Sequence, residues 1–171
     1  MIFLVFIVVY IVLFPLQTSL LSAIAVGGIS LDLALILTVY CGVLLKGDRG
    51  IWIGFTIGLI QDILSGSLLG VNTLSKSIIG FTFSTLKDKL MVEGFVPISI
   101  ILLAASFFDG LVYYLCMTAL LQAQIPFSFL FNTLPIYALY NALVGPILFF
   151  LINRVKNLIL RKFPLLEGSV Q

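Results

Sequence analysis

The strongest constraint on this chain is a succession of long apolar segments separated by short loops. Of its 171 residues, 61% are hydrophobic and only 9% are charged, against about 25% charged in a typical soluble domain. A helix needs ~20 apolar residues to cross the hydrocarbon core of a bilayer, and the chain has room for about six such helices. The composition therefore favours an all-α integral membrane protein and excludes a sizeable soluble domain.

We expect one transmembrane domain over residues 1–171, because no repeat, linker or low-complexity tract divides the chain. A secretory signal would begin with basic residues, but the chain has no Lys or Arg before Lys46. The first apolar segment is therefore interpreted as a retained span. A basic cytoplasmic tail, 153–171, follows the last span. The predicted spans are residues 2–21, 29–45, 50–65, 71–86, 95–121 and 131–152.

Basic residues set the predicted orientation. They occur after the second, fourth and sixth spans, and the loops 17–28, 66–70 and 122–130 have none. With six spans, all three basic clusters fall on one side, and Lys and Arg in short loops mark the cytoplasmic side. Both termini are therefore predicted to be cytoplasmic. The last cluster is expected to act as a basic membrane anchor, with a lipid-surface or partner contact as the alternative, and comprises Arg154, Lys156, Arg161 and Lys162.

Four charged residues fall within or at the edge of the predicted spans: Asp32, Asp62, Lys76 and Asp109. The predicted topology places all four in the outer half of the membrane. A charge at the bilayer centre costs roughly 2.5–3.5 kcal/mol on insertion scales, and pairing of opposite charges offsets this cost. Because a tight outer turn joins Asp62 to Lys76, we predict that these two side chains come within reach of each other, so that their charges can pair.

Small and polar residues recur every four positions on two neighbouring spans. One row contains Gly50, Gly54, Gly58 and Asp62, and the other contains Asn72, Lys76, Gly80 and Ser84. Such rows allow the backbones of membrane helices to approach closely, so the glycines are predicted to pack helices together. The candidates for an intramembrane polar site or partner contact are Asp32, Asp62, Ser65, Gly66, Gly70, Asn72, Lys76 and Asp109.

Residues suited to catalysis or metal binding are scarce. The chain has no histidine, and its two cysteines, Cys41 and Cys116, lack metal-ligand spacing. Asp62 and Asp109 lack the sequence surroundings of intramembrane aspartyl proteases. We therefore expect no enzyme activity, no catalytic residue, no cofactor and no metal. The few dispersed basic residues give no indication of a nucleic-acid partner.

The segment "GFTIGLIQDILSGSLLGVNTLSKSIIGF" resembles the best-marked stretch of the rod shape-determining protein MreD family, whose glycine-rich third span ends in Asp before a Ser-Gly turn. "SLDLALILTVYCGVL" resembles the family's second span, with Leu31 where Pro is usual, and "SFFDGLVYY" resembles its acidic fifth span. The family positions matched in the first segment are Gly54, Gly58, Asp62, Ser65, Gly66, Leu69, Gly70 and Gly80.

The resemblance implies a non-catalytic, multi-pass protein of the bacterial cytoplasmic (inner) membrane that helps to position lateral peptidoglycan synthesis. The implied partners are MreC, the RodA and class B transpeptidase synthase, and MreB, with no small-molecule substrate. The family is also similar in fold to the substrate-binding S-components of energy-coupling-factor vitamin transporters, and such a component is the alternative function. An ion or proton path is a third possibility, but it needs charges at several depths.

Overall fold

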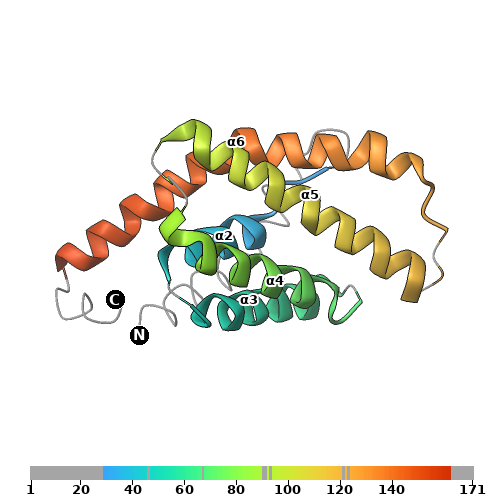
Figure 1. Ribbon diagram of the computed structural model, residues 1–171, viewed down its shortest axis with the longest axis horizontal. Helices are drawn as coiled ribbons and strands as arrows, with labels where there is room; N and C mark the ends of the chain where they lie inside the picture. Colours follow the sequence, from blue (N-terminus) through green and yellow to red (C-terminus); the bar gives the residue numbers. More distant parts are fainter. Residues whose placement is uncertain are drawn as a thin grey trace.

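The computed structural model describes residues 29–162 except residues 46, 67, 90, 91, 93, 121 and 123. The described chain is helical, which confirms the all-α prediction for this part of the protein. The predicted first span, 2–21, lies outside the described residues. The elements are α2 (Leu33–Leu44), α3 (Arg49–Ser65), α4 (Val71–Leu86), a short 3₁₀ helix η1 (Lys87–Lys89), α5 (Phe95–Leu120) and α6 (Ser128–Lys162) (Figure 1).

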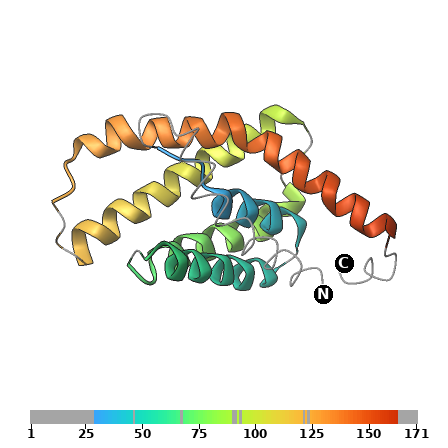
Figure 2. The same cartoon turned by 180° about the vertical axis from the view of Figure 1, so that it is seen from behind.

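Two helical hairpins make up most of the described structure. α3 packs along α4, and α5 packs along α6, with α2 contacting all four of these helices. In both ribbon views α2 lies in the middle, the α3–α4 hairpin lies on one side of it, and the long α5–α6 hairpin lies on the other (Figures 1 and 2). This arrangement brings segments far apart in the sequence to a common centre.

The central helix, α2, is the most buried element. Nine consecutive residues, from Ala34 to Gly42, are buried. With 12 residues, α2 is about 18 Å long at ~1.5 Å per residue, shorter than the ~30 Å hydrocarbon core of a bilayer. Within the predicted segment 29–45 the helix itself covers Leu33–Leu44 and begins only after Asp32.

Two of the described helices are long and apolar enough to cross a membrane, Phe95–Leu120 and Ser128–Leu158. α3 and α4 have 17 and 16 residues and match the predicted segments 50–65 and 71–86. The sixth predicted span ends at 152, but α6 continues to Lys162 without a break. Residues 153–162 are therefore part of a helix that changes direction along its length (Figure 1) and contains Pro135 and Pro146.

The distribution of polar and apolar side chains differs from that in a soluble bundle, although the core is also apolar. Large apolar side chains are exposed on each of α3, α4, α5 and α6, including Trp52, Leu74, Ile100 and Leu143. Charged and polar side chains, by contrast, lie among the most buried groups. They include Asp32, Asp62, Thr73, Ser75, Lys76, Ser106, Asp109 and Asn141. Exposed apolar surface on this scale indicates contact with lipid or protein rather than with water.

Candidate functional site

Lys76 of α4 is the centre of the candidate site and is fully buried. Its ammonium group has three hydrogens to donate, and the structure provides three acceptors for them. Nζ lies 2.8 Å from Asp109 Oδ1, 3.0 Å from Asp32 Oδ2 and 2.9 Å from Asn72 Oδ1. One side chain of α4 thus forms ion pairs with α5 and with the residue that precedes α2.

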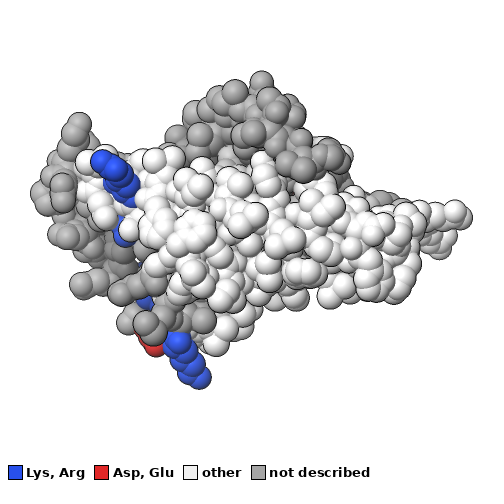
Figure 3. Space-filling view, turned by 90° about the horizontal axis from the view of Figure 1, so that it is seen from above, with Lys and Arg blue, Asp and Glu red and all other residues white. Residues whose placement is uncertain are grey.

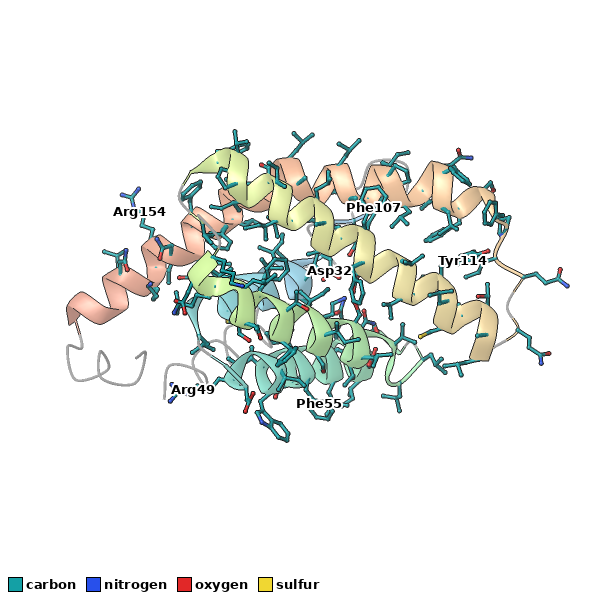
Figure 4. The ribbon with its side chains drawn as sticks, viewed as in Figure 1. Asp32, Arg49, Phe55, Phe107, Tyr114 and Arg154 are labelled. Atoms are coloured by element: carbon teal, nitrogen blue, oxygen red, sulfur yellow. The ribbon has the colours of Figure 1, made fainter. Side chains whose placement is uncertain are left out.

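Asp32 has two structural roles: it caps α2, and its carboxylate accepts hydrogen bonds from other helices. It is the N-cap of α2, where Oδ1 accepts a hydrogen bond of 3.0 Å from the Leu35 amide. A side-chain acceptor at this position satisfies an amide that has no partner within the helix. Gln61 of α3 donates to the same carboxylate, and the Asp32 amide donates to Asn141 of α6. The carboxylate lies near the middle of the bundle (Figure 4).

Asp109 of α5 completes the ion cluster. Its Oδ1 accepts hydrogen bonds from Ser75 Oγ at 2.5 Å and from Lys76 Nζ at 2.8 Å. Its other oxygen, Oδ2, lies 3.0 Å from the hydroxyl of Tyr137 on α6, and this hydroxyl also lies 3.2 Å from Asp32 Oδ2. We call Asp32, Lys76, Asp109 and Tyr137 the ion cluster; it joins residues of α4, α5 and α6 to the start of α2.

Among the described residues Asp62 forms no ion pair, so the expected direct pairing of its charge with Lys76 is not seen. The Asp62 carboxylate instead caps α4 from the end of α3. It accepts hydrogen bonds from the backbone amides of Gly70, Asn72 and Thr73 at 2.9–3.1 Å. Because Gly70, the N-cap residue, has no side chain to provide this acceptor, a carboxylate from the preceding helix takes its place at the positive end of the helix dipole.

Asn72 explains why Asp62 and Lys76 are near each other without pairing. Its side-chain amide donates to Asp62 Oδ1 at 2.9 Å, and its carbonyl oxygen accepts from Lys76 Nζ at 2.9 Å. The structure thus brings Asp32, Asn72, Lys76 and Asp109 together, with Asp62 joined to them through Asn72.

The α3–α4 turn is exposed. Gly66 and Gly70 have φ angles of +61° and +107°, a backbone region that glycine adopts far more readily than other residues. Ser65, Gly66 and Gly70 are all exposed, and Leu69 has 67% of its surface accessible. These residues shape the end of the hairpin.

The predicted glycine rows form the contact between α3 and α4. A side chain on Gly50 would overlap the Gly80 carbonyl oxygen, one on Gly54 would overlap that of Lys76, and one on Gly58 would overlap the Asn72 backbone. These glycines therefore let the helices approach closely, as their spacing predicts.

Basic residues from three predicted clusters gather at one end of the molecule. The Lys and Arg side chains visible in Figure 3 lie at this end, and Figure 4 places Arg49 and Arg154 there. Lys87 donates to the carbonyl of Leu44, which ties the end of α4 to the end of α2. Arg154 is exposed and Lys156 is partly buried, while Arg161 and Lys162 belong to the last turn of α6.

A cavity of about 400 Å³ lies beside the ion cluster. Asp109 and Tyr137 belong both to its wall and to the cluster, so the cavity reaches the buried charges. The lining is mixed polar and apolar and comprises Ile29, Ser30, Val71, Asn72, Asp109, Gly110, Tyr113, Phe129, Thr133, Leu134 and Tyr137. Its volume lies within the range of small-molecule sites.

Five residues of the polar network were absent from the sequence-based candidates: Gln61, Thr73, Ser75, Tyr137 and Asn141. Thr73 donates to Asp62 Oδ2 through both its amide and its hydroxyl. The only sequence signal for Tyr137 is its place in a polar row with Asn141 and Gly145, one every four residues. Gln61 and Ser75 adjoin predicted candidates in sequence but carry no spacing signal of their own.

A comparison with protein families identifies the chain. The model of the rod shape-determining protein MreD matches residues 1–155. The chain belongs to the MreD family. This MreD-family chain is thus a membrane protein that acts in rod-shape determination together with other shape-determining proteins. No significant match is found among curated proteins or among solved structures.

Family membership also explains the exposed apolar surface. In a membrane protein, the apolar side chains on the outside of α5 and α6 can face lipid, and both helices are long enough to cross a bilayer. The buried ion cluster is then shielded from lipid by the helices that carry it. The ion cluster connects helices, and this structural role agrees with membership in a family of shape-determining membrane proteins.

Proposed function

We propose that this protein is a non-catalytic subunit of the cell-elongation complex, spanning the bacterial cytoplasmic membrane several times with both termini in the cytoplasm. It forms one membrane domain and helps to position lateral peptidoglycan synthesis. Its partners are MreC, the RodA and class B transpeptidase synthase, and MreB. The observation that carries this proposal is the match of the MreD family model to residues 1–155.

The hydrogen bonds of Lys76 and Asp62 support a structural rather than a catalytic role for these buried charges. Lys76 donates all three of its hydrogens, to Asp32, Asp109 and Asn72, and Asp62 accepts five hydrogen bonds from the start of α4. Groups held in this way position helices, and neither is free to act as a nucleophile. The family match favours this function over the alternative, a vitamin-transporter S-component.

The partner surface that we propose lies at the end of the bundle that carries the α3–α4 turn. The glycine rows are used within the α3–α4 contact, so they are not available to a partner helix. The turn itself is exposed, with Leu69 projecting from it, and Val71 and Asn72 continue from the turn into the cavity wall. This surface can receive a transmembrane or juxtamembrane segment of a partner.

Recovery of MreC with variants of this protein tests the proposal. Leu69→Asn changes a side chain that is 67% exposed in the turn, and Leu120→Asn changes one that is 69% exposed at the end of α5. We expect Leu69→Asn to reduce both the recovery of MreC and the restoration of rod shape in depleted cells, while Leu120→Asn leaves both unchanged. Equal recovery with both variants and the unaltered protein would exclude the turn as the partner surface.

A further inference from the structure

The two helical hairpins differ in length. α3 and α4 have 17 and 16 residues, which makes each helix about 25 Å long at ~1.5 Å per residue. α5 has 26 residues and is about 39 Å long. In both ribbon views the α5–α6 hairpin extends beyond the α3–α4 turn (Figures 1 and 2). The hydrocarbon core of a bilayer is ~30 Å thick, so the long hairpin exceeds this thickness and the short hairpin falls below it.

The short hairpin carries polar groups at both of its ends. At the basic end, Asp48 and Arg49 lie at the start of α3, and Asp88 and Lys89 follow α4; all four side chains are exposed. At the other end lies the non-helical turn 66–70. Charged side chains are costly within the hydrocarbon, and lipid-exposed non-helical backbone does not occur there. The hydrocarbon beside this hairpin is therefore no thicker than the two helices are long.

The outward face of the short hairpin is apolar between these ends. Its exposed side chains include Phe55 of α3 and Ile78 of α4. The exposed hydroxyl of Thr82 donates to a helix carbonyl oxygen, so it does not require water. The charged residues in the interior of the two helices, Asp62 and Lys76, are buried. This face therefore suits lipid acyl chains better than it suits water.

Internal contacts limit how far the short hairpin can adapt to a thicker bilayer. A helix that is too short is matched by thinning of the lipid, by flanking side chains that extend to the membrane surface, or by self-association. Lys87 follows α4 directly, but its ammonium group donates a hydrogen bond of 2.6 Å to the Leu44 carbonyl oxygen. This side chain is thus held against the end of α2 and does not extend outward. Thinning and self-association remain, and they predict different neighbours for the apolar face.

We propose that the bilayer is thinned locally along the α3–α4 hairpin, to a hydrocarbon thickness of at most ~25 Å, and keeps its full thickness along α5. The partner at this surface is phospholipid with short or compressed acyl chains. The inference rests on the proposed multi-pass topology, in which α3 and α4 both cross the membrane. It does not depend on any protein partner.

Tryptophan quenching by a brominated lipid tests which acyl chains contact each hairpin. The chain has one tryptophan, and Trp52→Phe removes its signal. Two reporters are compared in this background, Ile78→Trp on α4 and Phe108→Trp on α5, at side chains that are 39% and 37% exposed. The full chain is reconstituted in brominated dioleoyl phosphatidylcholine mixed with one competing lipid. The competitors, in order of increasing chain length, are dimyristoleoyl, dioleoyl and dierucoyl phosphatidylcholine.

The short-chain competitor should be favoured at the short hairpin. At position 78 we expect dimyristoleoyl phosphatidylcholine to displace the brominated lipid better than dierucoyl phosphatidylcholine by a factor of about two or more, because its chains match the helix length. At position 108 this preference should be absent or reversed. Trp52 of the unaltered chain, which is 67% exposed on α3, should show the same preference as position 78.

Two results would overturn the thinning. One is the same chain-length preference at positions 78 and 108, or a preference for long chains at position 78. The other is quenching at position 108 without quenching at position 78 in any lipid, since a second copy of the chain rather than lipid would then cover the face.

The topology is checked separately with Leu69→Cys in the α3–α4 turn. A membrane-impermeant maleimide should label this cysteine in intact spheroplasts above the background of the unaltered chain. Labelling combined with no chain-length preference would overturn the thinning and leave the proposed topology standing. Absence of labelling would contradict the topology itself, and with it the inference.

Discussion

Lys76 donates a hydrogen bond of 2.8 Å to Asp109, a residue 33 positions further along the chain. This contact joins the α3–α4 hairpin to the α5–α6 hairpin inside the bundle. Lys76 also binds Asp32, which caps α2, so the central helix is attached to the same ammonium group. The packing of three elements therefore depends on one buried cation.

Replacing Asp62 with Ala should loosen the start of α4 without unpairing Lys76, because Lys76 keeps Asp32 and Asp109. Loss of an N-cap acceptor costs about 0.5–2 kcal/mol. Hydrogen exchange measures this change, and the amides of Gly70, Asn72 and Thr73 should exchange faster. Asp48→Ala is the matched control, since Asp48 precedes α3 but makes no side-chain cap bond. Unchanged exchange at these three amides would contradict the capping role.

Replacing Gly54 with Ala should force α3 away from α4, because the added methyl group would overlap the Lys76 carbonyl oxygen. Overpacking of this kind costs about 1–3 kcal/mol, which denaturation in detergent can measure. Ile63→Ala removes more atoms from the same helix but at a position that is 62% exposed. We expect the glycine variant to be the less stable of the two, and the reverse order would argue against close packing here.

Cysteine labelling tests the proposed orientation. Lys89→Cys lies at the basic end, and Gln124→Cys lies in the loop between α5 and α6; both positions are exposed. A membrane-impermeant maleimide should label position 124 in spheroplasts and should label position 89 only after the membrane is opened. The native cysteines, Cys41 and Cys116, give the background in the unaltered protein. Labelling of position 89 in intact spheroplasts would reverse the orientation.

Regular spacing made parts of this structure predictable. Glycines every four residues on two adjacent segments predict which faces of α3 and α4 meet, and the structure confirms this because close packing in membranes needs small side chains. Gly66 and Gly70 likewise mark the turn. These signals are local, since each depends on residues within one hairpin.

The choice of charge partners was not predictable in the same way. Asp62 is nearest to Lys76 in sequence, but the amides at the start of α4 are closer to its carboxylate. The true partners of Lys76 come from helices whose positions depend on the packing of the whole bundle. The length of α6 was also missed, because Arg154 and Lys156 indicate a membrane boundary but do not end a helix.

The most direct test of the ion cluster is a pair of double-mutant cycles on the free energy of unfolding in detergent. One cycle combines Lys76→Met with Asp109→Asn, and the other combines Lys76→Met with Asp62→Asn. Residues in one ion-pair network typically couple by about 0.5–3 kcal/mol. We predict coupling in this range for Lys76 with Asp109 and a clearly smaller value for Lys76 with Asp62. Stronger coupling to Asp62 than to Asp109 would contradict the account.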